Sequence, residues 1–312
     1  MIGVMSEPTT DLRVSVPEET WLESLADEPD TELVVWDPRE ADQPDGHLDL
    51  VVWPYDLGGG NAFTRLDVSR IGLVQLQSLG YDGVADAIGE GGRVANAVGV
   101  HEESTAELAV ALTLAALRDL PSHVRQQEHG EWRKAFTSSL IDRRVMLLGH
   151  GGIGTQVAAR LDGFGCELVR VASRARDEDG VYVHGTDELD ALLPTVDVVV
   201  AAVPYSAATH HLVDARFLAA LPDGALVVNV ARGKVADTDA ILAEAGRLRF
   251  ASDVWDPEPL PAGHPLWSAP GVLVSPHVGG MTSAMRPRIV RVVRGQLARL
   301  RAGDEPADVV VG

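Results

Sequence analysis

The sequence predicts an α/β protein with two domains, the larger one built on a doubly wound parallel sheet. Three observations predict this class. The 312 residues, 46% of them hydrophobic, suffice for about two domains with separate cores. Short apolar runs alternate with segments of helical periodicity along most of the chain. A glycine-rich turn stands between one such run and a helix.

The first hundred residues are predicted to form a small α/β unit. Short β-like runs at 32–36, 48–53 and 74–79 alternate there with turn-rich segments. From Glu103 to Leu120 apolar residues recur at helical spacing, and Pro121 just beyond predicts the end of that helix. We expect this helix to bridge the two domains.

Residues 144–277 are predicted to form the larger parallel sheet. Its strand candidates are the runs VMLLG, ELVRVA, VDVVVAAVP, ALVVNVA, RFASDVW and VLVSPHV. They are almost continuously apolar, as expected of parallel strands covered on both faces. A last helix, predicted from Met281 to Ala302, is expected to pack back on the first domain. The predicted domains are therefore 1–100 with 282–312, and 101–281.

Composition limits the partners and the compartment. A net charge of −20 leaves no basic face for nucleic acid or for an anionic membrane, so neither is expected as a partner. The single Cys166 cannot form an internal disulfide, the N-terminus lacks a signal-peptide pattern, and no apolar run approaches a membrane span. We expect a cytoplasmic protein in which any anionic ligand finds its positive charge locally.

The glycine-rich turn has the sequence GHGGIG at 149–154, directly after a predicted strand and directly before a helix. The first glycine permits a tight turn, the second lets a pyrophosphate approach the backbone, and the third lets helix and strand pack closely. This context predicts dinucleotide binding, and a glycine turn without a ligand is the alternative. The expected contacts are Gly149, Gly151, Gly152, Ile153 and Gly154.

The cofactor is expected to be NADP(H) in preference to NAD(H). An NAD site usually has an acidic residue at the end of the second strand, but this stretch is ASRAR at 172–176. It offers no carboxylate to repel a 2′-phosphate, whereas Ser173, Arg174 and Arg176 could bind one. Surface arginines without a ligand are the alternative.

Three further motifs follow the later strands: NVARG at 229–233, DVWDPEP at 253–259 and SPHVGG at 275–280. In this order, after the glycine loop, the sequence resembles the D-isomer-specific 2-hydroxyacid dehydrogenase family, and in particular its glyoxylate/hydroxypyruvate reductases. The likeness covers nearly the whole chain. It implies two Rossmann-like domains, with NAD(P) bound by 101–281 and substrate by the smaller, flavodoxin-like domain of 1–100 and 282–312.

The chemistry of a 2-oxo acid explains the residue types in these motifs. Hydride arriving at C2 puts negative charge on the carbonyl oxygen, so the site needs a proton donor and a fixed cation. His277 suits the first task, and Arg232 can grip carboxylate and carbonyl oxygens with its planar fork. Glu258 would favour the imidazolium and orient the ring. Taken singly, each of these residues could have a purely structural role, such as a loop or turn residue. The hypothesis of catalysis rests on finding all three in this order after the glycine loop.

The resemblance also implies further contacts. Asp253 is expected to accept a hydrogen bond from the nicotinamide carboxamide, and Thr105 and Pro204 are expected to lie against the cofactor. Leu79 and Gly80 resemble the loop whose backbone amides bind the substrate carboxylate, with a simple turn as the alternative. No metal site is expected. The bridging helix and the segment 126–136 resemble the family's dimer-forming region, so a homodimer is expected.

Two other functions remain open at this level. Formate and phosphite dehydrogenases share the fold, although glutamine in place of Glu258 would favour formate. A non-catalytic dinucleotide sensor resembling the C-terminal-binding corepressors would keep the fold without turnover. The substrate itself, a small 2-oxo or 2-hydroxy acid such as glyoxylate or hydroxypyruvate, depends on loop residues whose directions the sequence does not give.

Overall fold

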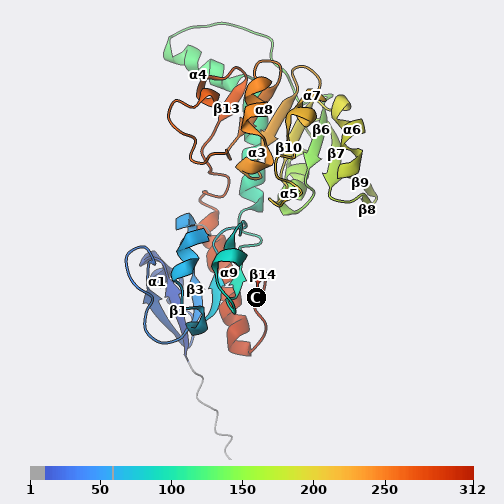
Figure 1. The fold of residues 1–312 in the computed structure, drawn as a ribbon. Helices are drawn as coiled ribbons and strands as arrows, with labels where there is room; N and C mark the ends of the chain where they lie inside the picture. The colour runs from blue at the N-terminus through green and yellow to red at the C-terminus, as the bar shows by residue number, and fades with distance from the viewer. Residues whose placement is uncertain (1–10, 58–59) are drawn as a thin grey trace, which may run out of the picture. The chain divides into compact units, whose positions relative to one another are not determined.

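The computed structural model describes residues 11–57 and 60–312 (Figure 1). By its contacts the chain divides into two compact units. The small unit contains the described residues up to His101 together with Ser283–Gly312, and the large unit is Glu102–Thr282. Each unit has its own sheet, so the α/β fold with two Rossmann-like halves that the sequence predicts is confirmed.

The small unit is built on a sheet with the strand order β14-β5-β4-β3-β1-β2. Its first five strands pair in parallel in the order 2-1-3-4-5, which is the flavodoxin-like order, and β14 adds antiparallel to β5. The strands are β1 (Leu12–Val16), β2 (Thr31–Val35), β3 (Leu48–Val52), β4 (Ile71–Gln75), β5 (Val94–Ala95) and β14 (Val309–Val311).

Helix α9 (Met285–Ala302) completes the core of the small unit. Its Ile289, Val293 and Leu297 are fully buried against strand residues such as Val14 and Leu50. The expectation that the last helix packs on the first domain is thus confirmed, although the helix begins at Met285 and not at Met281. The remaining helices are α1 (Thr20–Ser24), α2 (Val84–Ala87), η1 (Tyr55–Leu57), η2 (Gly60–Arg65) and η3 (Val68–Arg70).

The large unit is built on a sheet with the strand order β13-β12-β11-β10-β6-β7-β9-β8. All neighbours are parallel except the β8–β9 hairpin. The chain runs outward from β6 through β7 and returns to β10 on the other side, which makes a topological switch point between β6 and β10. The strands are β6 (Arg144–Leu148), β7 (Glu167–Ala172), β8 (Arg176–Glu178), β9 (Val181–Gly185), β10 (Val198–Ala201), β11 (Leu226–Asn229), β12 (Arg249–Ser252) and β13 (Val272–Val274).

Helices cover both faces of this sheet. One face packs against α3 (Glu102–Leu117) and α5 (Gly152–Leu161). The other packs against α6 (Leu189–Leu192), α7 (Ala215–Ala219) and α8 (Thr238–Ala243). Short 3-10 turns lie between these elements, namely η4 (Thr186–Glu188), η5 (Leu193–Thr195), η6 (Gly233–Val235) and η7 (Pro265–Ser268).

Two further sequence-predicted boundaries are wrong. The bridging helix ends at Leu117, and Pro121 lies in the first turn of a second helix, α4 (Leu120–Glu128). Proline lacks an N–H and is well tolerated in the first turn of a helix, so Pro121 lies near the beginning of α4 and does not mark the end of α3. The strand expected at 74–79 is β4, which ends at Gln75. The strands that pair with β4 end at Val52 and Ala95, so no partner strand extends β4 beyond Gln75. Leu79 therefore lies in a loop.

Candidate active site

The predicted site residues of the large unit lie in the loops that follow its parallel strands. The glycine loop follows β6, and the loops after β7, β10, β11, β12 and β13 carry, respectively, Ser173, Pro204, Arg232, Asp253 and His277. The carboxyl ends of parallel strands meet at one edge of a sheet, which is where α/β proteins bind ligands.

Backbone atoms leave no room for a side chain at two positions of the glycine loop, Gly149 and Gly154. Gly149 has φ +108, and a Cβ there would come within 2.5 Å of the Ala202 carbonyl oxygen. A Cβ on Gly154 would overlap the Gly149 carbonyl oxygen. At Gly151, by contrast, a Cβ would meet nothing within 4 Å, so the space beside the first turn of α5 is open. An open space beside a helix N-terminus is where an anionic group can approach the backbone amides.

Asp253 is an acceptor with an unused oxygen. Its side chain is 2% exposed, its Oδ2 accepts from the Gly279 amide at 2.8 Å, and its Oδ1 is buried without a hydrogen-bond partner. A Cβ on Gly279 would lie 3.3 Å from Thr105 Oγ1, so Thr105 borders the same spot. Burial raises the pKa of Asp253. A buried orphan oxygen needs a donor, and the NH₂ of a carboxamide would supply one.

His277 and Glu258 form a hydrogen-bonded pair. His277 Nδ1 and Glu258 Oε1 are 2.7 Å apart, and the two side chains are 45% and 40% exposed. The hydrogen bond to Glu258 raises the pKa of His277 above its ordinary value, against the opposing effect of burial. Burial raises the pKa of Glu258, but the hydrogen bond and charge of His277 outweigh it, so this pKa lies below its ordinary value.

Arg232 belongs to the same electrostatic group. Its positive charge lowers the pKa of both Glu258 and His277. Asn229, at the end of β11, fixes the backbone that carries it, since the Asn229 side chain accepts from the Ala231 amide and donates to the Arg232 carbonyl, both at 3.0 Å. A Cβ at the next residue, Gly233, would overlap the Trp255 carbonyl, so this turn needs a glycine.

Two arginines close behind β7 are in different situations, Arg174 in the loop and Arg176 at the start of β8. Arg174 is exposed and makes no ion pair in the described chain. Arg176 is paired with Glu178, whose Oε2 lies 2.8 Å from its Nε and 2.6 Å from its Nη2. Glu178 Oε1 also lies 4.0 Å from Nε2 of His150, a residue of the glycine loop.

The motif at 172–176 does not include Glu178, which lies two residues further on at the end of β8. The signal was available. Asp179 and Gly180 both have positive φ values, 51 and 79, and form the two-residue turn of the β8–β9 hairpin. An Asp-Gly pair between two short β-like runs is a strong hairpin signal. In this hairpin β9 pairs back along β8, and the Glu178 carboxylate at the end of β8 lies beside His150 of the glycine loop.

Leu79 and Gly80 lie in the small unit, in the loop after β4. The Leu79 carbonyl accepts a hydrogen bond from Asn96 at 2.9 Å, and the Gly80 carbonyl accepts one from Ser78 at 2.8 Å. Sequence reasoning did not single out Asn96, since its contact with this loop depends on the pairing of β4 with the two-residue strand β5.

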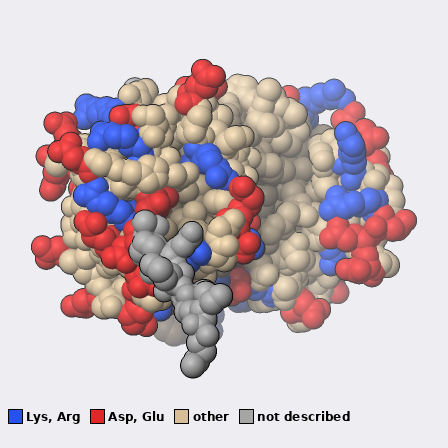
Figure 2. Space-filling view, turned by 90° about the horizontal axis from the view of Figure 1, so that it is seen from below, with Lys and Arg blue, Asp and Glu red and all other residues tan. Residues whose placement is uncertain are grey.

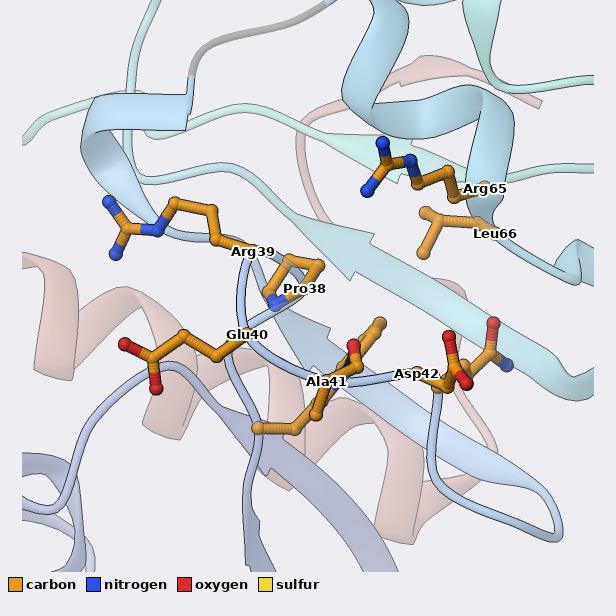
Figure 3. Close-up of a pocket in the computed structure, with 9 residues that line it drawn as sticks. Pro38, Arg39, Glu40, Ala41, Asp42, Arg65 and Leu66 are labelled. Atoms are coloured by element: carbon orange, nitrogen blue, oxygen red, sulfur yellow. Dashed lines mark hydrogen bonds between the residues drawn. The ribbon is translucent and has the colours of Figure 1, made fainter.

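A separate groove of about 320 Å³ lies elsewhere in the small unit (Figure 3). Its lining is of mixed charge, with Arg39 and Arg65 on one side and Glu40 and Asp42 on the other. Arg39 is already paired with Asp37 and Asp56, which lowers the attraction of the groove for an anion. We assign no ligand to it.

The surface charges do not form a single-sign field over the face seen in Figure 2. Lys and Arg atoms stand there in small groups beside Asp and Glu. Among the described residues, no group of three or more His, Cys, Asp or Glu is arranged to hold a metal ion. The part of the chain that the structure describes also contains no helix of the length and apolarity that crossing a membrane requires.

Comparison with known proteins gives consistent matches. The family profile described as D-isomer specific 2-hydroxyacid dehydrogenase, NAD binding domain, matches residues 110–279. A glyoxylate reductase of Korarchaeum cryptofilum is 31% identical over 254 residues, 77% of this chain and 76% of that protein. A mitochondrial formate dehydrogenase of Solanum tuberosum is 29% identical over 311 residues, 92% of this chain and 80% of that protein.

A solved structure extends the likeness to the whole fold. An NADPH-dependent glyoxylate/hydroxypyruvate reductase of Sinorhizobium meliloti, in complex with NADP and malonate, superposes with a TM-score of 0.77 at 26% identity. The match covers 96% of this chain and 97% of that one. The chain therefore belongs to the D-isomer-specific 2-hydroxyacid dehydrogenase family and is an NAD(P)-dependent oxidoreductase that moves a hydride to or from a small 2-oxo or 2-hydroxy acid.

Proposed function

We propose that this protein reduces a small 2-oxo acid, with glyoxylate and hydroxypyruvate as the first candidates, to the 2-hydroxy acid, which has the D configuration where C2 is a stereocentre. The proposal assigns three catalytic residues: His277 as the acid/base, Glu258 as its partner and Arg232 as the substrate-binding cation. The observation that carries it is the 2.7 Å hydrogen bond between His277 and Glu258 within the field of Arg232.

The proton would come from His277. Glu258 occupies Nδ1 of the ring, so Nε2 is the nitrogen left to donate to the substrate carbonyl oxygen. Because Glu258 raises the pKa of His277, the imidazolium is more populated near neutral pH than that of an isolated histidine. In the reverse direction the neutral ring would take the proton of the 2-hydroxyl group.

Arg232 would orient the substrate and stabilise the developing charge. Its guanidinium can hold a carboxylate oxygen and the carbonyl oxygen with two parallel N–H groups. The Asn229 contacts described above keep its backbone in place before substrate arrives. This pre-organisation lowers the cost of reaching the transition state.

The bound dinucleotide supplies the hydride. We assign the pyrophosphate to the loop of Gly149, Gly151, Gly152, Ile153 and Gly154, and the nicotinamide carboxamide to Asp253, beside Thr105 and Pro204. The open space at Gly151 and the orphan oxygen of Asp253 support these positions. The large unit would then be the cofactor domain, and the small unit would carry the substrate contacts Leu79 and Gly80.

We propose NADPH as the preferred cofactor. Ser173 and Arg174 are exposed after β7, and Arg174 has no competing carboxylate, so the pair suits a 2′-phosphate. Arg176 could add a second guanidinium. However, Glu178 neutralises it in the structure, so we expect the preference for NADPH to be moderate.

A homodimer is proposed from the apolar surface of α4 and the segment that follows it. Leu120, Val124, Trp132, Phe136 and Ile141 are large hydrophobic residues whose side chains are between 47% and fully exposed. They lie on one continuous segment, which Figure 1 shows running outward from α4 before it returns to β6. A second copy of the chain could cover this surface.

The absence of a possible internal disulfide fits the expected cytoplasmic location.

The test is a screen of 2-oxo acids against NADPH and NADH, with His277→Asn as the matched control. We expect oxidation of NADPH with glyoxylate or hydroxypyruvate, and a loss of about 100-fold or more in kcat for His277→Asn with little change in NADPH affinity. Tight cofactor binding without turnover of any acid would indicate the dinucleotide sensor. Turnover of formate or phosphite with NAD would indicate the other dehydrogenases.

A further inference from the structure

All the carbonyl groups of the loop of residues 77–81 accept hydrogen bonds from protein donors. The Ser78 carbonyl accepts from the Ala97 amide at 2.9 Å, and the Tyr81 carbonyl accepts from the Val84 amide at 3.1 Å. These two contacts are made by backbone atoms. The three remaining carbonyls, those of residues 77, 79 and 80, are bound by side chains.

Three side chains make those contacts. Asn96 Nδ2 donates to the Leu79 carbonyl at 2.9 Å, Ser78 Oγ donates to the Gly80 carbonyl at 2.8 Å, and His101 Nε2 donates to the Gln77 carbonyl. Asn96 and His101 are only 7% and 4% exposed. Water therefore has little access to replace Asn96 or His101 as a donor if either side chain is lost.

The amides of the same loop are unused. In the described parts of the small unit, the N–H groups of Leu79, Gly80 and Tyr81 donate to no protein acceptor. The planar trans peptide links the two observations, because an amide N–H points opposite to the carbonyl of the preceding residue. Holding the carbonyls of residues 78, 79 and 80 inward thus directs the amides of residues 79, 80 and 81 outward.

A row of unpaired amides is a binding site for an anion. In a chain with a net charge of −20, such backbone dipoles are a local source of positive potential for a carboxylate. We infer that Asn96 and Ser78 are positioning residues for the substrate carboxylate: they fix the peptide planes of the loop and do not themselves touch the substrate. This inference rests on the proposed function, which places the carboxylate at Leu79 and Gly80.

Without these donors the peptide planes gain freedom to rotate. The Leu79 or Gly80 carbonyl oxygen could then turn outward and face the substrate carboxylate with like partial charge. The effect falls on substrate binding, since neither residue belongs to the cofactor loop or to the His277–Glu258 pair. A general loss of folding, by contrast, would affect the cofactor and the substrate alike.

The experiment compares Ser78→Ala with Ser78→Thr, which keeps the hydroxyl group. For Ser78→Ala we expect KM for glyoxylate to rise about tenfold, as for the loss of one hydrogen bond near a charged ligand, with kcat and the KM for NADPH nearly unchanged. Ser78→Thr should restore most of the substrate affinity. Ser69→Ala removes an exposed hydroxyl elsewhere in the small unit and serves as the control.

A second readout isolates the carboxylate. Methyl glyoxylate carries the same carbonyl without the negative charge, so the ratio of kcat/KM for glyoxylate to that for the ester should fall in Ser78→Ala and in Asn96→Ala. Thermal unfolding of each variant records any loss of folding. A Ser78→Ala protein with the KM and the ratio of the unaltered enzyme would overturn the inference alone. Absence of turnover of every 2-oxo acid by the unaltered enzyme would overturn the proposed function as well.

Discussion

In the proposed mechanism, Arg232 is the residue for which side-chain shape matters most. A guanidinium presents two parallel donors, whereas an ammonium group is a single point charge. Arg232→Lys therefore keeps the charge and removes the fork. We expect kcat/KM for the 2-oxo acid to fall about 100-fold in this variant, with a larger loss in Arg232→Ala. Steady-state kinetics measure both.

The cofactor provides the control for that experiment. The KM for NADPH should stay within a small factor of the unaltered value in both Arg232 variants, because the glycine loop and Asp253 do not depend on this side chain. Equal loss of cofactor and substrate affinity would contradict the assignment of Arg232 to the substrate.

The His277–Glu258 pair predicts a pH effect with a definite sign. In the proposed mechanism, reduction needs protonated His277, so the rate should fall as pH rises through its pKa. Glu258 raises that pKa, and Glu258→Gln removes the charge responsible. The high-pH limb of kcat/KM for reduction should therefore move to lower pH in Glu258→Gln. If the high-pH limb of kcat/KM stays at the same pH in Glu258→Gln, a group other than His277 sets the pH dependence.

At the residue scale the motifs identified the chemistry, but not all of the supporting contacts. The order of Arg232, Glu258 and His277 after a glycine loop is visible in the sequence because each follows a strand signal. The contact between Asn96 and Leu79 is not visible, because it depends on which strands pair and in what register.

Among the elements, the hairpin of β8 and β9 adds a feature to the proposed cofactor site. It brings Glu178 to Arg176, where a 2′-phosphate would have to compete for the guanidinium. For Glu178→Gln we expect kcat/KM with NADPH to rise about threefold, the size of a surface ion pair, with little change for NADH. Kinetics with both cofactors measure this selectivity.

Asp177→Asn is the matched control for Glu178→Gln. It removes the same charge from the adjacent residue of β8, whose side chain points to the opposite side of the strand. An equal gain for NADPH in both variants would mean that net charge, and not the pairing with Arg176, sets the preference.

Element boundaries were the less predictable part of the fold. The central strands of the large unit could be recognised because they are buried on both faces and so almost continuously apolar. The break between α3 and α4 could not, because apolar residues continue through Leu117 and Leu120. There the backbone turns at Asp119, which has φ +52.

For the whole molecule, the exposed apolar segment after α3 predicts the oligomeric state. Trp132→Ser combined with Phe136→Ser removes the two most exposed large side chains of this segment. We expect the unaltered protein to have the mass of a dimer in light scattering and the double variant to shift toward the monomer. Leu22→Ser, an exposed leucine in the small unit, is the control. A monomeric unaltered protein would contradict the proposal.

Helix α9 and strand β14 also have a consequence for biosynthesis. The small unit draws its core from both sides of Glu102–Thr282, and Ile289, Val293 and Leu297 fill the space beside β1 and β3. During synthesis, residues 11–101 emerge from the ribosome first. Synthesis of the large unit then takes on the order of 10 to 40 s before the three side chains of α9 emerge. During that interval the early strands stay incomplete, so the large unit is the part that can fold first on the nascent chain.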